Sequence, residues 1–194
     1  MSINILKHLE IMVPFTEDIN RRVHGRGLED GLDLSQKSIQ KKLNGLEQEG
    51  ILESETSGRT KQFSLNQENI LTQKAVIMAE LVKFYNLMSS SFEVKEIVGE
   101  VLNKTSSSFL VYGSFAKGNY DETSDLDILI IGKNGNGIVE INEKYSRDIH
   151  FMFISKKEFK EGIERNESYV NEVLKNHVIC RGFENITSWR FEYG

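Results

Sequence analysis

Two aspartates separated by one residue, Asp125 and Asp127, stand at the start of an apolar run that ends at Ile131. Side chains alternate between the two faces of a strand, so both carboxylates should point the same way. Neighbouring carboxylates repel each other, and burying either one without a partner is costly. A divalent cation with oxygen ligands removes that cost. The pattern therefore predicts a site for Mg²⁺ or Mn²⁺ here.

A short turn precedes this acidic pair. The apolar run 109–112 predicts a strand, and Gly113 and Ser114 follow it directly. Successive backbone N–H groups in such a turn can cradle phosphate oxygens. The turn is therefore a candidate phosphate-binding site next to the candidate metal site.

The stretch from Gly113 to Asp127 resembles the signature of the nucleotidyltransferase superfamily that includes DNA polymerase β: Gly-Ser, a few residues, Gly, a spacer and Asp-x-Asp. The Gly-Ser-Phe-Ala-Lys-Gly turn and the Ser-Asp-Leu-Asp form are most similar to the minimal nucleotidyltransferases. The resemblance covers about residues 92–180. It implies transfer of a nucleoside monophosphate from a nucleoside triphosphate, with ATP the expected nucleotide, to a hydroxyl acceptor. The alternative is a hairpin with a solvated acidic end.

The family also implies catalytic roles. Asp125 and Asp127 would hold metal ions, and a third carboxylate would come from a neighbouring strand. Asp148, at the start of the apolar alternation 149–154, is the candidate. It would converge with Asp125 and Asp127 on one cation site as a metal ligand, and it would orient or deprotonate the acceptor hydroxyl. The alternative is a strand-edge aspartate beside Arg147. His150 shares the face of Asp148, either as a base or ligand or as a hydrogen-bonded histidine of the sheet.

Phosphate contacts are implied for residues of the turn and for the serine before the acidic pair. This nucleotide-binding set is Gly113, Ser114, Lys117, Gly118 and Ser124. Lys117 departs from the family, which more often has Arg there. A lysine is a point charge without the two-pronged geometry of a guanidinium.

Composition indicates a cytoplasmic protein of one or two domains, because the chain has 194 residues and no apolar run of the roughly 20 residues that cross a membrane. No secretory leader and no membrane partner are expected. The single cysteine, Cys180, excludes an internal disulfide and a cysteine zinc cluster, and it lies in an apolar pattern that predicts burial. The net charge of −5 does not favour general attraction to nucleic acid, so a local basic surface is needed.

Residues 1–69 are predicted to form a separate unit. Ile3, Ile5, Leu6, Leu9 and Met12 suggest a helix that ends before Pro14. A short second helix is expected at 18–23, followed by a glycine-rich stretch. Ser35 is a good N-cap for a third helix that stops at Gly50. Two extended segments, 51–55 and 62–65, then flank a turn that carries two positively charged side chains, Arg59 and Lys61.

This unit resembles a winged helix-turn-helix module over about residues 3–66. In that family the last helix enters the major groove and the wing touches backbone phosphates. The resemblance implies helix contacts with double-stranded DNA from Gln36, Lys37, Ser38, Gln40 and Lys41, and wing contacts from Arg59 and Lys61. The weakly marked second helix and the glycine-rich insert depart from the family. A winged helix used only for protein association is the alternative.

Further helices are expected around the catalytic unit. The segment 70–91 is predicted to be a connecting helix whose broad apolar side packs within the chain or against a second copy in a homodimer. A helix is expected at 92–103, and residues 139–145 fit either a strand or a short helix. Ser155 and Glu158 predict a capping box. A last helix is expected at 169–181, with Trp189 in the core.

The sequence thus predicts an α/β (α+β) chain. A winged helix-turn-helix occupies 1–69, a connecting helix 70–91, and a nucleotidyltransferase domain with a small mixed sheet flanked by helices 92–194. The expected function is a DNA-binding transcriptional regulator that carries a metal-dependent nucleotidyltransferase. The alternative is an antitoxin-type enzyme that transfers AMP to a partner toxin, with the winged helix serving association or autoregulation.

Overall fold

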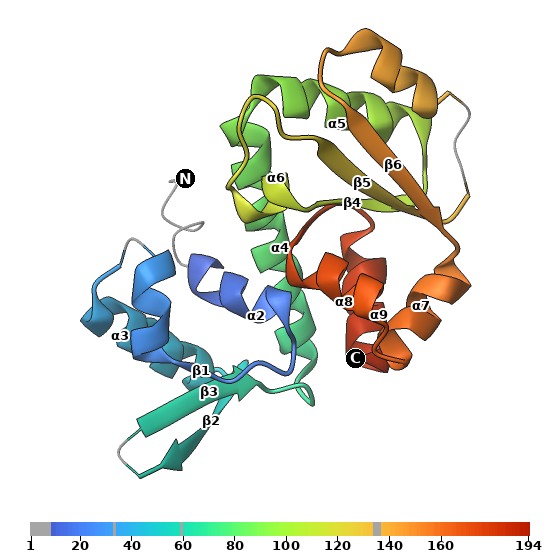
Figure 1. The fold of residues 1–194 in the computed structure, drawn as a ribbon. Helices are drawn as coiled ribbons and strands as arrows, with labels where there is room; N and C mark the ends of the chain where they lie inside the picture. The colour runs from blue at the N-terminus through green and yellow to red at the C-terminus, as the bar shows by residue number, and fades with distance from the viewer. Residues whose placement is uncertain (1–8, 33, 59, 134–136) are drawn as a thin grey trace. The chain divides into compact units, whose positions relative to one another are not determined.

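The computed structural model describes residues 9–32, 34–58, 60–133 and 137–194 (Figure 1). The chain divides into two compact units, Met1–Val82 and Lys83–Gly194. The boundary falls inside one long helix, α4 (Ile70–Ser90). This helix was predicted at 70–91, and its existence is confirmed.

The first unit combines short helices with a small sheet. Its elements are η1 (Glu10–Met12), α2 (Val13–Glu17), β1 (Val23–His24), η2 (Gly25–Gly31), α3 (Gln36–Gln48), β2 (Leu52–Ser57) and β3 (Thr60–Leu65). The strands form an antiparallel sheet in the order β1-β3-β2. Ser35 caps α3, because its hydroxyl accepts a hydrogen bond from the Ser38 amide. Ile39 and Leu43 bury the inner face of α3.

The helix predicted to end before Pro14 is described only from Leu9 on, where η1 ends at Met12. Pro14 lies in the first turn of a separate helix, α2, where a missing N–H breaks no helical hydrogen bond. The prediction of the next helix is wrong. No helix forms at 18–23. Asp18 is extended and accepts a hydrogen bond from the Asn20 amide, and Val23 joins β1 opposite Phe63. The expected contributions of Ile3, Ile5 and Leu6 lie outside the described residues.

The second unit is built on a mixed sheet. After α4 its elements are α5 (Phe92–Lys104), β4 (Ser108–Tyr112), α6 (Ser114–Lys117), β5 (Leu126–Ile131), η3 (Val139–Lys144), β6 (Ile149–Ile154), α7 (Lys156–Glu164), α8 (Ser168–Lys175), β7 (His177–Arg181) and α9 (Phe183–Tyr193). The strand order in the described part is β6-β5-β4-β7. Strand β5 is antiparallel to β4 and parallel to β6.

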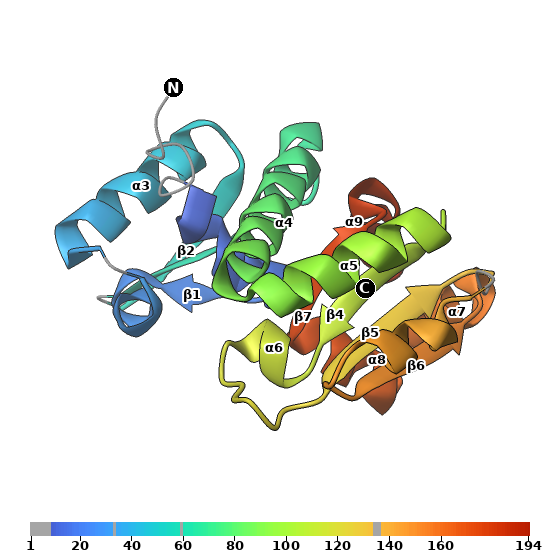
Figure 2. The same cartoon turned by 90° about the horizontal axis from the view of Figure 1, so that it is seen from above.

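Helices lie on both faces of this sheet (Figure 1 and Figure 2), and each face has its own core. On one face, Phe109, Ile128 and Ile149 pack with residues of α5 and η3. On the other face, Leu110 and Leu129 pack with residues of α7, α8 and α9. Alternate residues of β4 and β5 therefore serve opposite cores, which is the period-2 rule for a strand buried on both sides.

Several predictions for this unit are confirmed and one is wrong. Helix α5, the capping box of Ser155 with Glu158, and the burial of Trp189 and Cys180 agree with expectation. The ambiguous segment 139–145 forms a 3₁₀ helix over most of its length. The predicted helix 169–181 is wrong in its second half, because α8 ends at Lys175 and β7 then pairs with β4. Within the described ranges, no helix is long and apolar enough to span a membrane.

Candidate active site

The acidic pair lies at the start of β5, between two neighbouring strands. Asp125 directly precedes the strand, and Asp127 is its second residue. Asp127 stands opposite Tyr112, the last residue of β4, and opposite His150 on β6. The side chain of Asp125 is 47% exposed and that of Asp127 only 27% exposed. The two carboxylates therefore sit in different environments, one in solvent and one at the rim of the core.

Gly113 leaves room for the Asp127 carboxylate. Its φ is +74° and its ψ −143°, a backbone conformation that residues with a side chain rarely adopt. A Cβ atom on Gly113 would stand 2.5 Å from Oδ2 of Asp127. The glycine that begins the predicted phosphate-binding turn is thus also the residue that allows the backbone to approach the acid.

The turn itself is one short helical turn, α6, which starts after Gly113 and ends at Gly118. Gly118 has φ +73° and closes the turn, since its amide donates to the carbonyl of Phe115 at 3.2 Å. The side chain of Lys117 is exposed and Ser114 is half-buried. The Ser124 hydroxyl accepts a hydrogen bond from the Asp121 amide at 2.9 Å and donates one to the Asp121 carboxylate at 3.0 Å, and its role in nucleotide binding stays a prediction.

His150 is the side chain that contacts both aspartates. Its Nδ1 lies 3.4 Å from Oδ1 of Asp127, and its Nε2 lies 4.0 Å from Oδ2 of Asp125. Burial raises the pKa of Asp127 above its ordinary value, the imidazole of His150 opposes this rise, and the charge of Asp125 adds to it. The imidazole is therefore part of the electrostatic environment of the pair.

Asp148 lies directly before β6, next in register to Asp125. Its carbonyl accepts a hydrogen bond from the Leu126 amide at 2.9 Å, and its side chain is exposed. Across the residues that the structure describes, no three His, Cys, Asp or Glu side chains are grouped to hold a metal ion. The predicted convergence of Asp148 with Asp125 and Asp127 is not formed here, and its role stays a prediction.

Sequence reasoning missed an aromatic cluster beside Asp127. The hydroxyls of Tyr112 and Tyr169 each lie 3.1 Å from Sδ of Met152. Burial raises the pKa of Tyr112, and its contact with Tyr169 and the charge of Asp127 act in the same direction. Both phenols therefore stay neutral and can donate hydrogen bonds. The position of Tyr112 as the last residue before Gly113 was the one sequence signal for it.

The predicted DNA contacts occupy different settings in the first unit. Gln36, Lys37 and Lys41 are exposed on α3, whereas Ser38 and Gln40 are half-buried. Gln40 donates to Oδ1 of Asn44 at 3.2 Å. Lys61 lies on β3, and its ammonium is 2.5 Å from a carboxylate oxygen of Glu47, so its contact with DNA stays a prediction. Arg59 lies outside the described residues.

The small mixed sheet, with the Asp-x-Asp pair beside a glycine turn, is consistent with a nucleotidyltransferase fold. The description "Nucleotidyltransferase domain" is that of a family model that matches residues 93–189, half of the 194-residue chain. The chain therefore belongs to the nucleotidyltransferase domain family. No curated protein and no solved structure matches it.

Proposed function

We propose that this protein transfers a nucleoside monophosphate from a nucleoside triphosphate, with ATP the expected nucleotide, to a hydroxyl acceptor in a metal-dependent reaction. The observation that carries the proposal is the placement of Gly113 against Asp127, which joins the glycine turn to the acidic pair in one site. Membership of the family supports the transfer reaction in general.

The donor atoms fit a hard divalent cation. Asp125 and Asp127 offer carboxylate oxygens from one strand, and these are the ligands that Mg²⁺ and Mn²⁺ prefer. The raised pKa of Asp127 indicates that the surrounding residues do not fully compensate its ionised form. When bound, the cation would neutralise charge on the phosphates and on the attacking oxygen.

The chain's own residues would bind and orient the substrate. The amides around Gly113 and Gly118 and the hydroxyl of Ser114 would bind terminal phosphate oxygens, and Lys117 would add a positive charge. Asp148 would orient the acceptor hydroxyl from the neighbouring strand. Such reactions depend on positioning and charge neutralisation more than on covalent chemistry by the protein.

Nucleotide binding should depend on the metal. Titration of the full chain with each of the four nucleoside triphosphates, by calorimetry, is expected to show binding with Mg²⁺ and a loss of about tenfold or more in affinity with a chelator, because phosphate charge then meets uncompensated carboxylates. The acceptor can be found by mass spectrometry of candidate proteins incubated with labelled nucleotide. Absence of binding for all four nucleotides would contradict the proposal.

We further propose that the first unit binds double-stranded DNA and that the protein is a transcriptional regulator. The observation that favours this role is the exposed face of α3. Its residues Gln36, Lys37, Gln40 and Lys41 line a hollow of about 740 Å³, together with Asn44, Gly45 and Gln48. Amide side chains can read base edges, and the lysines can pair with phosphates.

Removing the two exposed lysines should weaken binding on any duplex. For Lys37→Ala with Lys41→Ala, the slope of log affinity against log salt should fall by about 0.9 for each phosphate that the protein no longer neutralises. Gln36→Ala should instead relax sequence preference. Gel shifts with the chain's own upstream region and with random duplex measure both effects, and Lys95→Ala, on the exposed surface of α5, is a control for the removal of a surface lysine.

Failure of both duplexes to bind at low salt would overturn the regulator role. The antitoxin-type alternative, AMP transfer to a partner toxin, would then be the better account of the second unit. In that case the first unit would serve association.

A further inference from the structure

The loop that joins α6 to β5 is stabilised by hydrogen bonds between its own residues. The carboxylate of Asp121 accepts hydrogen bonds from the amide and hydroxyl of Thr123, at 2.9 and 2.8 Å, and from the Ser124 hydroxyl at 3.0 Å. These hydrogen bonds hold the pKa of Asp121 below its ordinary value. The loop leads directly into Asp125, so its position sets where that carboxylate lies.

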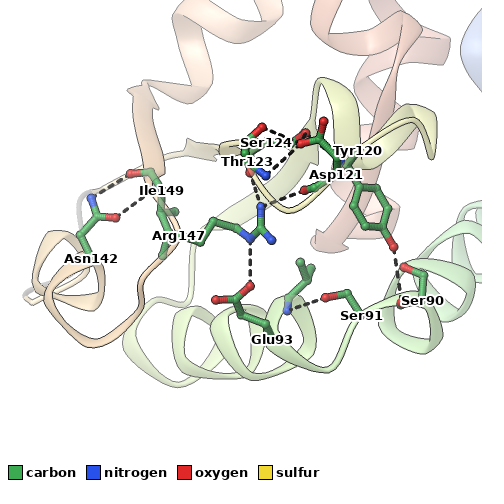
Figure 3. A network of polar contacts seen from close by, with 11 residues as sticks. Ser90, Ser91, Glu93, Tyr120, Asp121, Thr123, Ser124, Asn142, Arg147 and Ile149 are labelled. Carbon is green, nitrogen blue, oxygen red and sulfur yellow. Dashed lines mark hydrogen bonds and ion pairs between the residues drawn. The ribbon is translucent and has the colours of Figure 1, made fainter.

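Arg147 ties this loop to the rest of the second unit (Figure 3). One guanidinium nitrogen donates to the backbone carbonyl of Ser124 and lies 3.4 Å from the carbonyl of Asp121. Its Nε donates to a carboxylate oxygen of Glu93, at the start of α5, at 2.9 Å. The Arg147 side chain is only 13% exposed. One side chain therefore links the loop, α5 and the start of β6.

Aromatic packing supports the same arrangement. The guanidinium carbon of Arg147 lies 5.0 Å from the centre of the Phe115 ring. Phe115 also stacks with Tyr120, with ring centres 4.1 Å apart. The Tyr120 hydroxyl lies 3.4 Å from the carbonyl of Ser90. The loop is thus held near its beginning by Tyr120 and near its end by Arg147.

We propose that Arg147 is a positioning residue for the acidic pair. By holding the Ser124 carbonyl it fixes the next residue, Asp125, beside Asp127 in the geometry that binds the cation. This inference rests on the proposed function. A planar guanidinium reaches two carbonyls and a carboxylate at once, whereas a lysine ammonium lacks this fixed fork. Residues behind metal ligands typically contribute roughly 10- to 100-fold to metal affinity.

The test measures Mn²⁺ alone, by electron paramagnetic resonance, on the full chain. Arg147→Ala should lower Mn²⁺ affinity by about 10- to 100-fold, and Arg147→Lys should lie between it and the unaltered chain. Glu93→Gln, which keeps Arg147 but weakens its anchor, should give a smaller loss. Arg165→Ala, an exposed arginine at the end of α7, should change nothing.

Amide hydrogen exchange separates positioning from general destabilisation. In Arg147→Ala, exchange should accelerate at 119–125 more than at β4 and β5, which form the core of the sheet. Uniform acceleration, or Mn²⁺ affinity within about twofold of the unaltered chain, would overturn the inference. If Arg147→Ala fails to fold, Glu93→Gln decides by the same two measurements. If the unaltered chain binds no Mn²⁺, the proposed function fails, and loop exchange alone decides whether Arg147 holds the loop.

Discussion

Asp127→Asn should reduce nucleotidyl transfer by about a thousandfold, the scale seen when one group that stabilises transition-state charge is removed. The substitution replaces one carboxylate oxygen with an amide NH₂ group, which removes the negative charge and leaves the shape of the side chain almost unchanged. Metal affinity should fall with the activity. Single-turnover transfer to the identified acceptor, together with Mn²⁺ titration, measures both losses.

The same variant should be at least as stable as the unaltered chain at neutral pH. Burial raises the pKa of Asp127 in the folded state, so folding favours its protonated form. The stabilising contribution of protonated Asp127 is present below the pKa of the unfolded chain, about 3.8. It is lost as the pH rises through the higher pKa that Asp127 has in the folded chain. The advantage of the asparagine variant should therefore shrink as urea unfolding is repeated at pH values approaching 3.8.

Glu122→Gln supplies the matched control. This residue is exposed in the loop that precedes β5, and its substitution removes one negative charge, as Asp127→Asn does. It should leave both transfer and metal affinity unaltered. Transfer that survives in Asp127→Asn would mean that the acidic pair does not hold the metal.

Gly113→Ala should lose both stability and metal binding. A residue with a side chain is strained at φ +74°, and strain of this kind costs about 1–3 kcal/mol. The new Cβ would also stand 2.5 Å from the Asp127 carboxylate, so the acid must move. Urea unfolding measures the first effect and Mn²⁺ titration the second, for which we expect a loss of about 10-fold or more.

Gly182→Ala separates these two effects. Gly182 also has a positive φ, of +84°, but its added Cβ would meet Ser108, at the far end of β4 from Tyr112. This control variant should be less stable than the unaltered chain. Under conditions in which it is folded, it should bind the metal with unaltered affinity. Equal loss of metal affinity in both variants would show that the effect comes from general destabilisation.

Local spacing was enough to predict the framework of the site. Alternation along β5 placed Asp125 and Asp127 on one face, and the glycine turn followed from the end of the apolar run before it. The capping box of Ser155 and the extent of α5 also depend on neighbouring residues alone. Such features are encoded within a few residues, because they arise from backbone sterics and hydrogen bonds between near neighbours.

The secondary structure of short apolar runs could not be predicted from local spacing. The run 178–180 fits a buried helix or a buried strand equally well, since periodicity cannot separate them over so few residues. Hydrogen-bonded pairing with β4 makes this run a strand, β7. In the same way, the pairing of Val23 with Phe63 outweighs any helical tendency of the segment 18–23.

Only the tertiary structure decided which side chains surround the acidic pair. Arg147 reaches Glu93 across 54 positions of the chain, and His150 contacts both aspartates because β6 lies parallel to β5. Lys61 pairs with Glu47 because β2 packs on α3 and carries its partner strand β3 with it. The sequence determined the candidate ligands and the turn, because these lie in one continuous segment. Packing determined their neighbours, because it brings together residues that no local period relates.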